Sequence, residues 1–362
     1  MDCEKKAWLV LHLLLLTACY MQHCVAENSP QVPCFFIFGD DYSDNGNNNN
    51  LRTTAKANYS PYGIDFPNGP TGRTTNGETV ADKIGKLLGL KNYIPPFANT
   101  TGSNILQGVN YASSSAGLLF TTGKMMGTNI DSEQQIANHK IVVDQIAIKL
   151  GGVINARKLL KKCVIYVETG SNDYLLNYLQ PQLLSITGTL NAELFAQLLI
   201  DLYAVDGELM YQIGGRKFVA VGLGKIGCIP RIIASRNGSC DEELNKAASI
   251  FNQKLKALVD LFGIIHPDTK AIFINTTAIT FNNSSGFTNF NASCCPIKPD
   301  GYCIPDSKPC QNINEHLFYD GIHPTSAANN IIASRSYDSA NNTEIAYPFD
   351  IKRLAEFNIG SS

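Results

Sequence analysis

Four short apolar runs stand out from the polar positions of the chain, at residues 34–38, 163–167, 217–221 and 271–274, and the third begins with Lys217. Glycine follows the first and third runs directly and stands close to the end of the second. In these runs apolar residues do not alternate with polar ones. Such a run predicts a strand that is buried on both faces, as in a parallel sheet. The pattern therefore predicts a mostly parallel sheet in the core.

Between these runs, apolar residues recur at helical spacing over 80–88, 192–213 and 242–262. Asp241 directly precedes the last segment and is suited to cap its helix. Strands that alternate with helices predict one α/β domain, a three-layer α/β/α sandwich over residues 27–362. In such sheets, ligands bind at the carboxyl ends of the strands.

The N-terminal 26 residues have a different pattern. Lys5 and Lys6 precede an apolar run at 7–21, and the small residues Cys24 and Ala26 follow. This order predicts a signal peptide at residues 1–26, cleaved near Ala26, and a secreted, extracellular protein. The alternative is an uncleaved anchor helix, but the run is shorter than the ~20 residues that a span requires. No later stretch is apolar enough to cross a bilayer.

Eight of the 11 cysteines follow residue 26. An even number favours disulfides, and disulfides are typical of exported proteins. Zinc binding is the alternative, but no CxxC pair completes a tetrahedral site. The starts of two predicted strands place Cys34 and Cys163 within bonding reach if the strands are neighbours. Cys228 and Cys240 flank one loop and form a second predicted pair. The remaining four cysteines predict two more bonds, with their partners left open: Cys294, Cys295, Cys303 and Cys310.

Composition and surface motifs indicate which classes of binding partner and which modifications to expect. The net charge is -2 and no basic patch stands out, which argues against nucleic acid. Sequons for N-glycosylation, expected on the surface of an exported protein, begin at seven asparagines: Asn99, Asn237, Asn275, Asn282, Asn283, Asn291 and Asn341.

Four polar segments lie where a predicted strand or helix ends: 38–46, 108–117, 170–173 and 320–324. Taken singly, each is weak evidence: segments like 170–173 and 320–324 are typical of turns, and the small residues of 112–117 are typical of close backbone packing. Their joint occurrence in one order resembles the plant GDSL esterase/lipase family, a branch of the SGNH hydrolases. The resemblance runs from about residue 33 to about residue 354 and includes segments without chemistry, such as 61–66, 69–73, 227–230 and 327–329.

The resemblance implies roles for individual residues. His323 is the expected general base and Asp320 the acid that orients it, and the two intervening residues allow a turn to bring them together. The expected oxyanion hole combines the backbone N–H groups of position 41 and Gly117 with the side-chain amide of Asn172. The family implies no cofactor or metal and a small-molecule or lipid ester as ligand. The oligomeric state is left open.

The chain departs from the family at the nucleophile, since Gly39, Asp40 and Asp41 stand where the family has Gly-Asp-Ser. A carboxylate attacks a carbonyl far less readily than an activated hydroxyl does, and it would occupy the oxyanion donors. Its charge would also favour the imidazolium form of the base. We therefore expect impaired ester turnover; the alternative is a non-catalytic relative that binds an acyl or ester ligand.

Two other nucleophiles are weaker alternatives. Ser43 lies two residues further on, and neighbours at that spacing face different ways. Asp41 itself could attack an alkyl carbon, but nothing in the sequence indicates such a substrate. We expect Asp40 and Asp44 to bond loop backbone rather than a metal ion.

Overall fold

The computed structural model describes residues 8, 30–100, 105–179 and 190–359. The predicted signal peptide lies outside these residues apart from Trp8. In the described part of the chain, no helix is both long enough and apolar enough to cross a bilayer.

A five-stranded sheet forms the centre of the molecule in the order β1-β2-β3-β4-β7. The first four strands are parallel and the last pairs antiparallel with β4. The four predicted strands are therefore present, each within one residue of the apolar run that predicted it. The strands are β1 (Phe35–Gly39), β2 (Val164–Glu168), β3 (Lys217–Val221), β4 (Lys270–Ile274) and β7 (Ala346–Tyr347).

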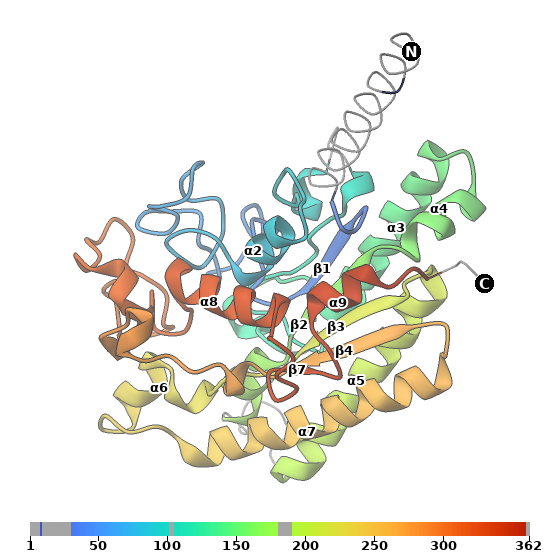
Figure 1. Cartoon of the computed structure of the whole chain (residues 1–362). Helices are drawn as coiled ribbons and strands as arrows, with labels where there is room; N and C mark the ends of the chain where they lie inside the picture. The colour runs from blue at the N-terminus through green and yellow to red at the C-terminus, as the bar shows by residue number, and fades with distance from the viewer. Residues whose placement is uncertain (1–7, 9–29, 101–104, 180–189, 360–362) are drawn as a thin grey trace.

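Helices cover both faces of this sheet, which confirms the α/β/α sandwich (Figure 1). Alternate residues of each strand point to opposite faces, so Phe36 and Phe38 join one apolar core while Phe35 and Ile37 join the other. The first core contains α3 (Ser132–Lys149), α4 (Val153–Leu160), α5 (Ala192–Ile213), α6 (Pro230–Ser235) and α7 (Glu242–Ile265). The second contains α2 (Val80–Leu87), α8 (Ser326–Tyr337) and α9 (Ile351–Glu356).

The three helices that the sequence predicts are α2, α5 and α7. Asp241 caps α7 as expected, because its side chain accepts a hydrogen bond from the backbone N–H of Leu244 at 3.0 Å. The sequence did not predict α3, whose buried positions include the polar residues Gln135, Asn138 and His139. These residues interrupt the apolar repeat by which an amphipathic helix is recognised.

Four disulfides link the eight cysteines after residue 26. Both predicted pairs are present: Cys34 with Cys163 across the starts of β1 and β2, and Cys228 with Cys240 beyond β3. The two pairs that the sequence left open are Cys294–Cys310 and Cys295–Cys303. The last two bonds hold the segment before the Asp320 motif, close to a small two-stranded sheet of β5 (Asn289–Ser293) and β6 (His316–Phe318).

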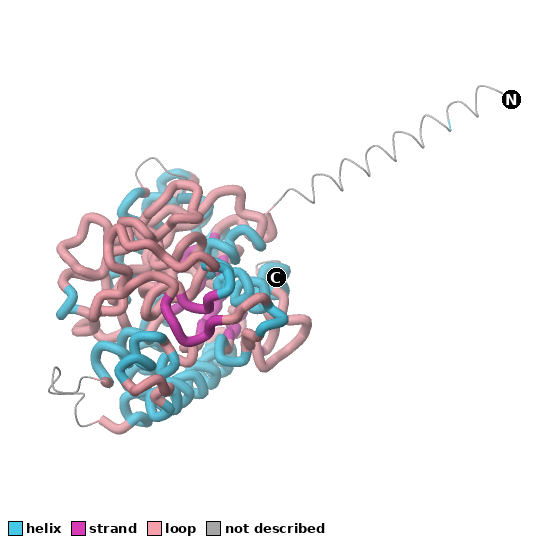
Figure 2. Tube along the Cα trace, turned by 90° about the vertical axis from the view of Figure 1, so that its left-hand side faces the viewer, coloured by secondary structure: helices cyan, strands magenta, loops and turns pink. Residues whose placement is uncertain are grey.

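Loops are the main structure on the side of the molecule that faces the viewer in Figure 2. Six of the seven predicted sequon asparagines are exposed and Asn275 is half-buried. The glycosylation itself stays a prediction. The residues described next include Asp41 in the loop after β1, Asn172 after β2, and Asp320 and His323 after β6.

Candidate active site

Asp320 and His323 meet as their spacing implies. His323 Nδ1 lies 2.9 Å from Asp320 Oδ2, and Asp320 Oδ1 also accepts the backbone N–H groups of Ile322 and His323 at 2.8 and 2.7 Å. Tyr62 donates its hydroxyl to Oδ2 at 2.6 Å. The carboxylate therefore fixes both the turn and the imidazole ring, and leaves Nε2 free to face the site.

Asp41 is surrounded by hydrogen-bond donors. Its Oδ2 accepts the backbone N–H of Ser115 at 2.8 Å and the side-chain amide of Asn172. Its Oδ1 accepts the hydroxyl of Tyr302 and lies 3.7 Å from His323 Nε2. Two donors on one oxygen and a base beside the other match the arrangement in which an oxyanion hole and a general base meet a reacting carboxyl group. Here a protein side chain occupies that position.

Tyr302 is a residue of this centre that the sequence did not indicate. It lies in the loop that the Cys295–Cys303 disulfide closes, more than 250 positions from Asp41, in a segment without a recognisable motif. Burial and the adjacent Asp41 carboxylate raise the pKa of the Tyr302 hydroxyl well above its usual range. The phenol therefore stays protonated and acts as a donor to Asp41.

Gly117 occupies a different place from the one expected of it. The loop N–H that reaches Asp41 is that of Ser115, which has a left-handed backbone with a φ of 64°. A Cβ at position 117 would lie 2.4 Å from Asp173 Oδ2. Asp173 accepts the N–H groups of Leu118 and Leu119, both at 2.9 Å. The missing side chain of Gly117 therefore lets Asp173 hold this loop, and no hydrogen bond of the described residues links Gly117 to Asp41.

The remaining polar residues of the first motif hold its loop. Asp44 accepts the N–H groups of Gly46 and Asn47, and both the N–H and hydroxyl of Ser114, at 2.8–2.9 Å. This is the backbone role expected of it. Ser43 donates its hydroxyl to Glu168 Oε2 at 2.7 Å and makes no contact with His323 among its hydrogen bonds in the described chain.

Gln135 is a second residue that the sequence did not indicate. From α3 it accepts the backbone N–H of Gly39 at 3.0 Å and donates to the carbonyl of the same residue at 2.9 Å. These bonds hold the end of β1 directly before Asp40 and Asp41, so Gln135 fixes the position from which the Asp41 side chain enters the site.

The whole centre is closed to solvent. His323 is 1% exposed and Asp41 is 4% exposed, and His323 Nε2 is buried without a hydrogen-bond partner. Burial favours the neutral imidazole, but Asp320 and then Asp41 outweigh it and raise the pKa of His323. Burial, together with Asp41 and Glu168, raises the pKa of the Asp40 carboxyl well above its usual range. His323 is thus biased toward its protonated form, in which the imidazole cannot accept a proton.

An apolar cavity of about 430 Å³ lies beside this centre, beyond the carboxyl ends of β2, β3 and β4. Tyr42 lines the cavity and also packs its ring edge-on against His323, with the ring centroids 5.3 Å apart. Tyr42 therefore lies between His323 and the cavity. A volume of this size lies within the range of about 300–1,000 Å³ that is usual for small-molecule sites.

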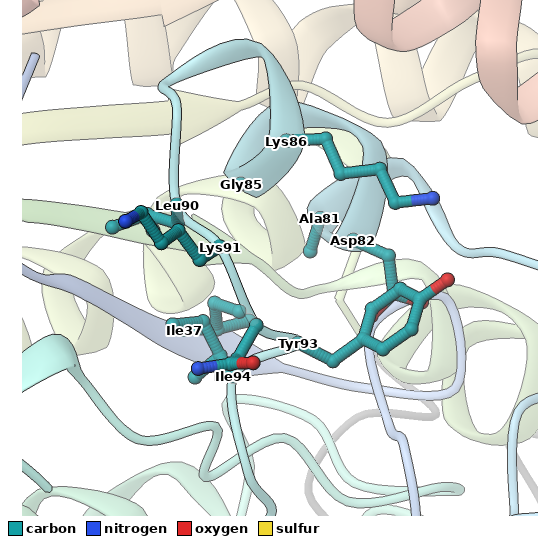
Figure 3. A pocket seen from close by; sticks show the side chains of 10 residues that line it. Ile37, Ala81, Asp82, Gly85, Lys86, Leu90, Lys91, Tyr93 and Ile94 are labelled. Atoms are coloured by element: carbon teal, nitrogen blue, oxygen red, sulfur yellow. The ribbon is translucent and has the colours of Figure 1, made fainter. Parts of the chain in front are cut away.

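A much smaller pocket lies against α2 and is shown in Figure 3. Its volume of about 40 Å³ exceeds the ~10–15 Å³ that one water needs but falls far short of a ligand site. It is lined by Ile37, Lys86 and Tyr93, among others, and by none of the predicted site residues.

Two clusters of the described residues combine side chains of metal-binding type. They are Cys294, Cys310 and His316, and Cys228, Cys240 and Glu242. In each cluster the two cysteines form a disulfide, so neither sulfur is a thiolate available to a metal ion.

A family comparison and a comparison with individual proteins both match this chain to GDSL-type lipases and esterases. The family described as GDSL-like lipase/acylhydrolase matches residues 35–336. Three GDSL esterase/lipases of Arabidopsis thaliana are 43%, 45% and 44% identical to this chain. The matches cover 98%, 90% and 91% of this chain and 100%, 92% and 94% of the respective relatives.

Proposed function

The chain belongs to the GDSL-like lipase/acylhydrolase family, and on that premise we propose that it is a secreted ester-hydrolase scaffold in which serine-type turnover is impaired. Membership supports an ester-hydrolase-like function with a small-molecule or lipid substrate. The four disulfides and the predicted signal peptide support export, since such bonds persist in oxidising compartments.

One observation carries the proposal: the Asp41 carboxylate accepts the hydrogen bonds of Ser115 and Asn172 that an ester oxyanion would need. A substrate carbonyl would have to displace a charged group that is already bound. The position also lacks a hydroxyl that His323 could activate. Asp41 thus hinders both the binding of an ester carbonyl and the attack on it.

A non-catalytic ligand-binding relative is the second candidate. The apolar cavity supports it, because the cavity offers space for a ligand while the polar centre beside it is filled. Both candidates place an ester or acyl ligand next to Asp41, and they differ only in whether residual turnover exists.

The decisive experiment compares the wild type with Asp41→Ser on short-chain p-nitrophenyl esters. We expect the serine variant to gain roughly 10³-fold or more in rate, because it restores the nucleophile to an otherwise complete centre. Asp41→Ala is the matched control, since it opens the oxyanion donors without adding a nucleophile. Asp41→Ser combined with His323→Ala should lose the gain.

The proposal fails if the wild type already turns over these esters efficiently and His323→Ala abolishes that activity. Thermal unfolding of each variant shows whether a loss of activity is caused by a loss of folded protein.

A further inference from the structure

The cavity beside the centre is apolar over most of its surface. Its walls include Leu223, Ile226 and Ile229 after β3, and Phe281, Phe290 and Phe318 from the segments after β4. An apolar wall takes an apolar ligand by removing its surface from water. What makes this cavity specific is its acidic side chain, Glu168, at the end of β2.

Glu168 has one engaged oxygen and one free oxygen. Oε2 accepts the hydroxyl groups of Ser43 at 2.7 Å and Tyr166 at 3.1 Å. Within the described chain Oε1 accepts no hydrogen bond, and it is not sealed from solvent. Burial raises the pKa of Glu168, and a cation placed beside the carboxyl would lower it again.

The charges around the cavity favour a cation. Other carboxyl groups lie close behind Glu168, since burial and then Asp41 and Glu168 raise the pKa of the Asp40 carboxyl. Lys225 is the one cation among the residues that line the cavity, and it is exposed at the rim, where water screens it. Aromatic rings such as those of Tyr42 and Phe281 also attract cations over their faces.

We propose that this cavity binds an amphiphile with a cationic amine head and an apolar tail, with Glu168 Oε1 as the partner of the amine. The ligand class is thereby an amine-bearing apolar molecule rather than a fatty-acid anion. The inference rests on the proposed function only in taking the cavity as the place of the ligand; it concerns binding and requires no turnover.

The test is calorimetric titration of the wild-type protein with three probes of equal chain length: octylammonium, 1-octanol and octanoate, at neutral pH. We expect octylammonium to bind about 10- to 100-fold more tightly than 1-octanol, the range of a hydrogen bond to a charged group. Octanoate should bind most weakly. In Glu168→Gln, octylammonium should fall to the affinity of 1-octanol, while 1-octanol is unchanged.

Lys225→Gln is the matched control, because it removes the other charge of the same cavity. The affinity of this variant for octylammonium should stay within about twofold of the wild-type value, as expected when an exposed charge is removed. Tightest binding of octanoate would overturn the proposal, and so would an unchanged preference for the amine in Glu168→Gln, or no binding of any probe. None of these outcomes depends on the esterase assay with neutral esters, so this inference and the proposed function fail separately.

Discussion

The polar centre around Asp41 and the apolar cavity next to it are neighbours with opposite properties. In the centre every carboxylate oxygen of Asp41 and Asp320 has a donor, and Tyr302 is 1% exposed. The cavity is open, apolar and about 430 Å³ in volume. The polar centre is therefore filled by its own side chains, whereas the neighbouring cavity leaves space for a ligand.

The two regions also differ in how they contribute to stability. A buried carboxylate is costly unless its hydrogen bonds are complete, so removal of one member of the centre leaves others unsatisfied. A cavity wall already faces open space and has fewer contacts to lose. Substitutions in the centre should therefore reduce stability, whereas substitutions in the cavity should alter binding.

Asp320→Ala should give the largest effect. It removes the acceptor of four hydrogen-bond donors and leaves His323 buried without its counter-charge, which typically costs about 3–5 kcal/mol. Urea unfolding measures this loss, and Glu168→Gln serves as the cavity counterpart with an expected change below about 1 kcal/mol. Equal losses in the two variants would remove the contrast between the regions.

Tyr302→Phe should destabilise the wild type by about 1–3 kcal/mol, because Asp41 Oδ1 loses a donor while it stays buried. In the Asp41→Ser background the same change should cost less than about 0.5 kcal/mol, since no carboxylate remains to be satisfied. Denaturant unfolding of the four proteins closes a double-mutant cycle. A coupling energy near zero would mean that Tyr302 does not hold Asp41.

The central strands, and with them the fold class, could be predicted from sequence because their residues face apolar cores on both sides. Asp320 and His323 are close in sequence, so their contact could be expected once the family resemblance had marked the two residues. Tyr302 and Gln135 could not be found this way, since each reaches the centre from a distant segment and only tertiary packing sets its partner. Nor could the pairing of the adjacent Cys294 and Cys295 be decided, because one-residue offsets exchange their partners.

His323 provides a direct reading of the charge of Asp41. Burial lowers the pKa of His323, but Asp320 and then Asp41 outweigh burial and raise the pKa above the ordinary value of about 6.5. Asp41→Asn removes the charge with little change in shape, so the pKa of His323 should fall. NMR titration of the imidazole in both proteins measures the shift, and an unchanged pKa would exclude Asp41 as its cause.

The raised pKa of His323 also determines how the free energy of unfolding changes with pH. Protonation of His323 is favoured more in the folded state than in the unfolded state, so its contribution is complete below about pH 6.5 and is lost as the pH rises through the folded pKa. The wild type should therefore lose more stability than Asp41→Asn over that rise in pH.

Phe290→Ala should give the smallest change and separates the tail of a ligand from its head. Phe290 lines the cavity and is only partly buried, so its loss should leave the free energy of unfolding within about 1 kcal/mol. It should weaken octylammonium and 1-octanol by the same factor, about fivefold, because both lose equal apolar contact. Calorimetry on the same probes checks this. A loss confined to the amine would show that Phe290 contacts the head through its ring face, and the tail would then have to lie elsewhere in the cavity.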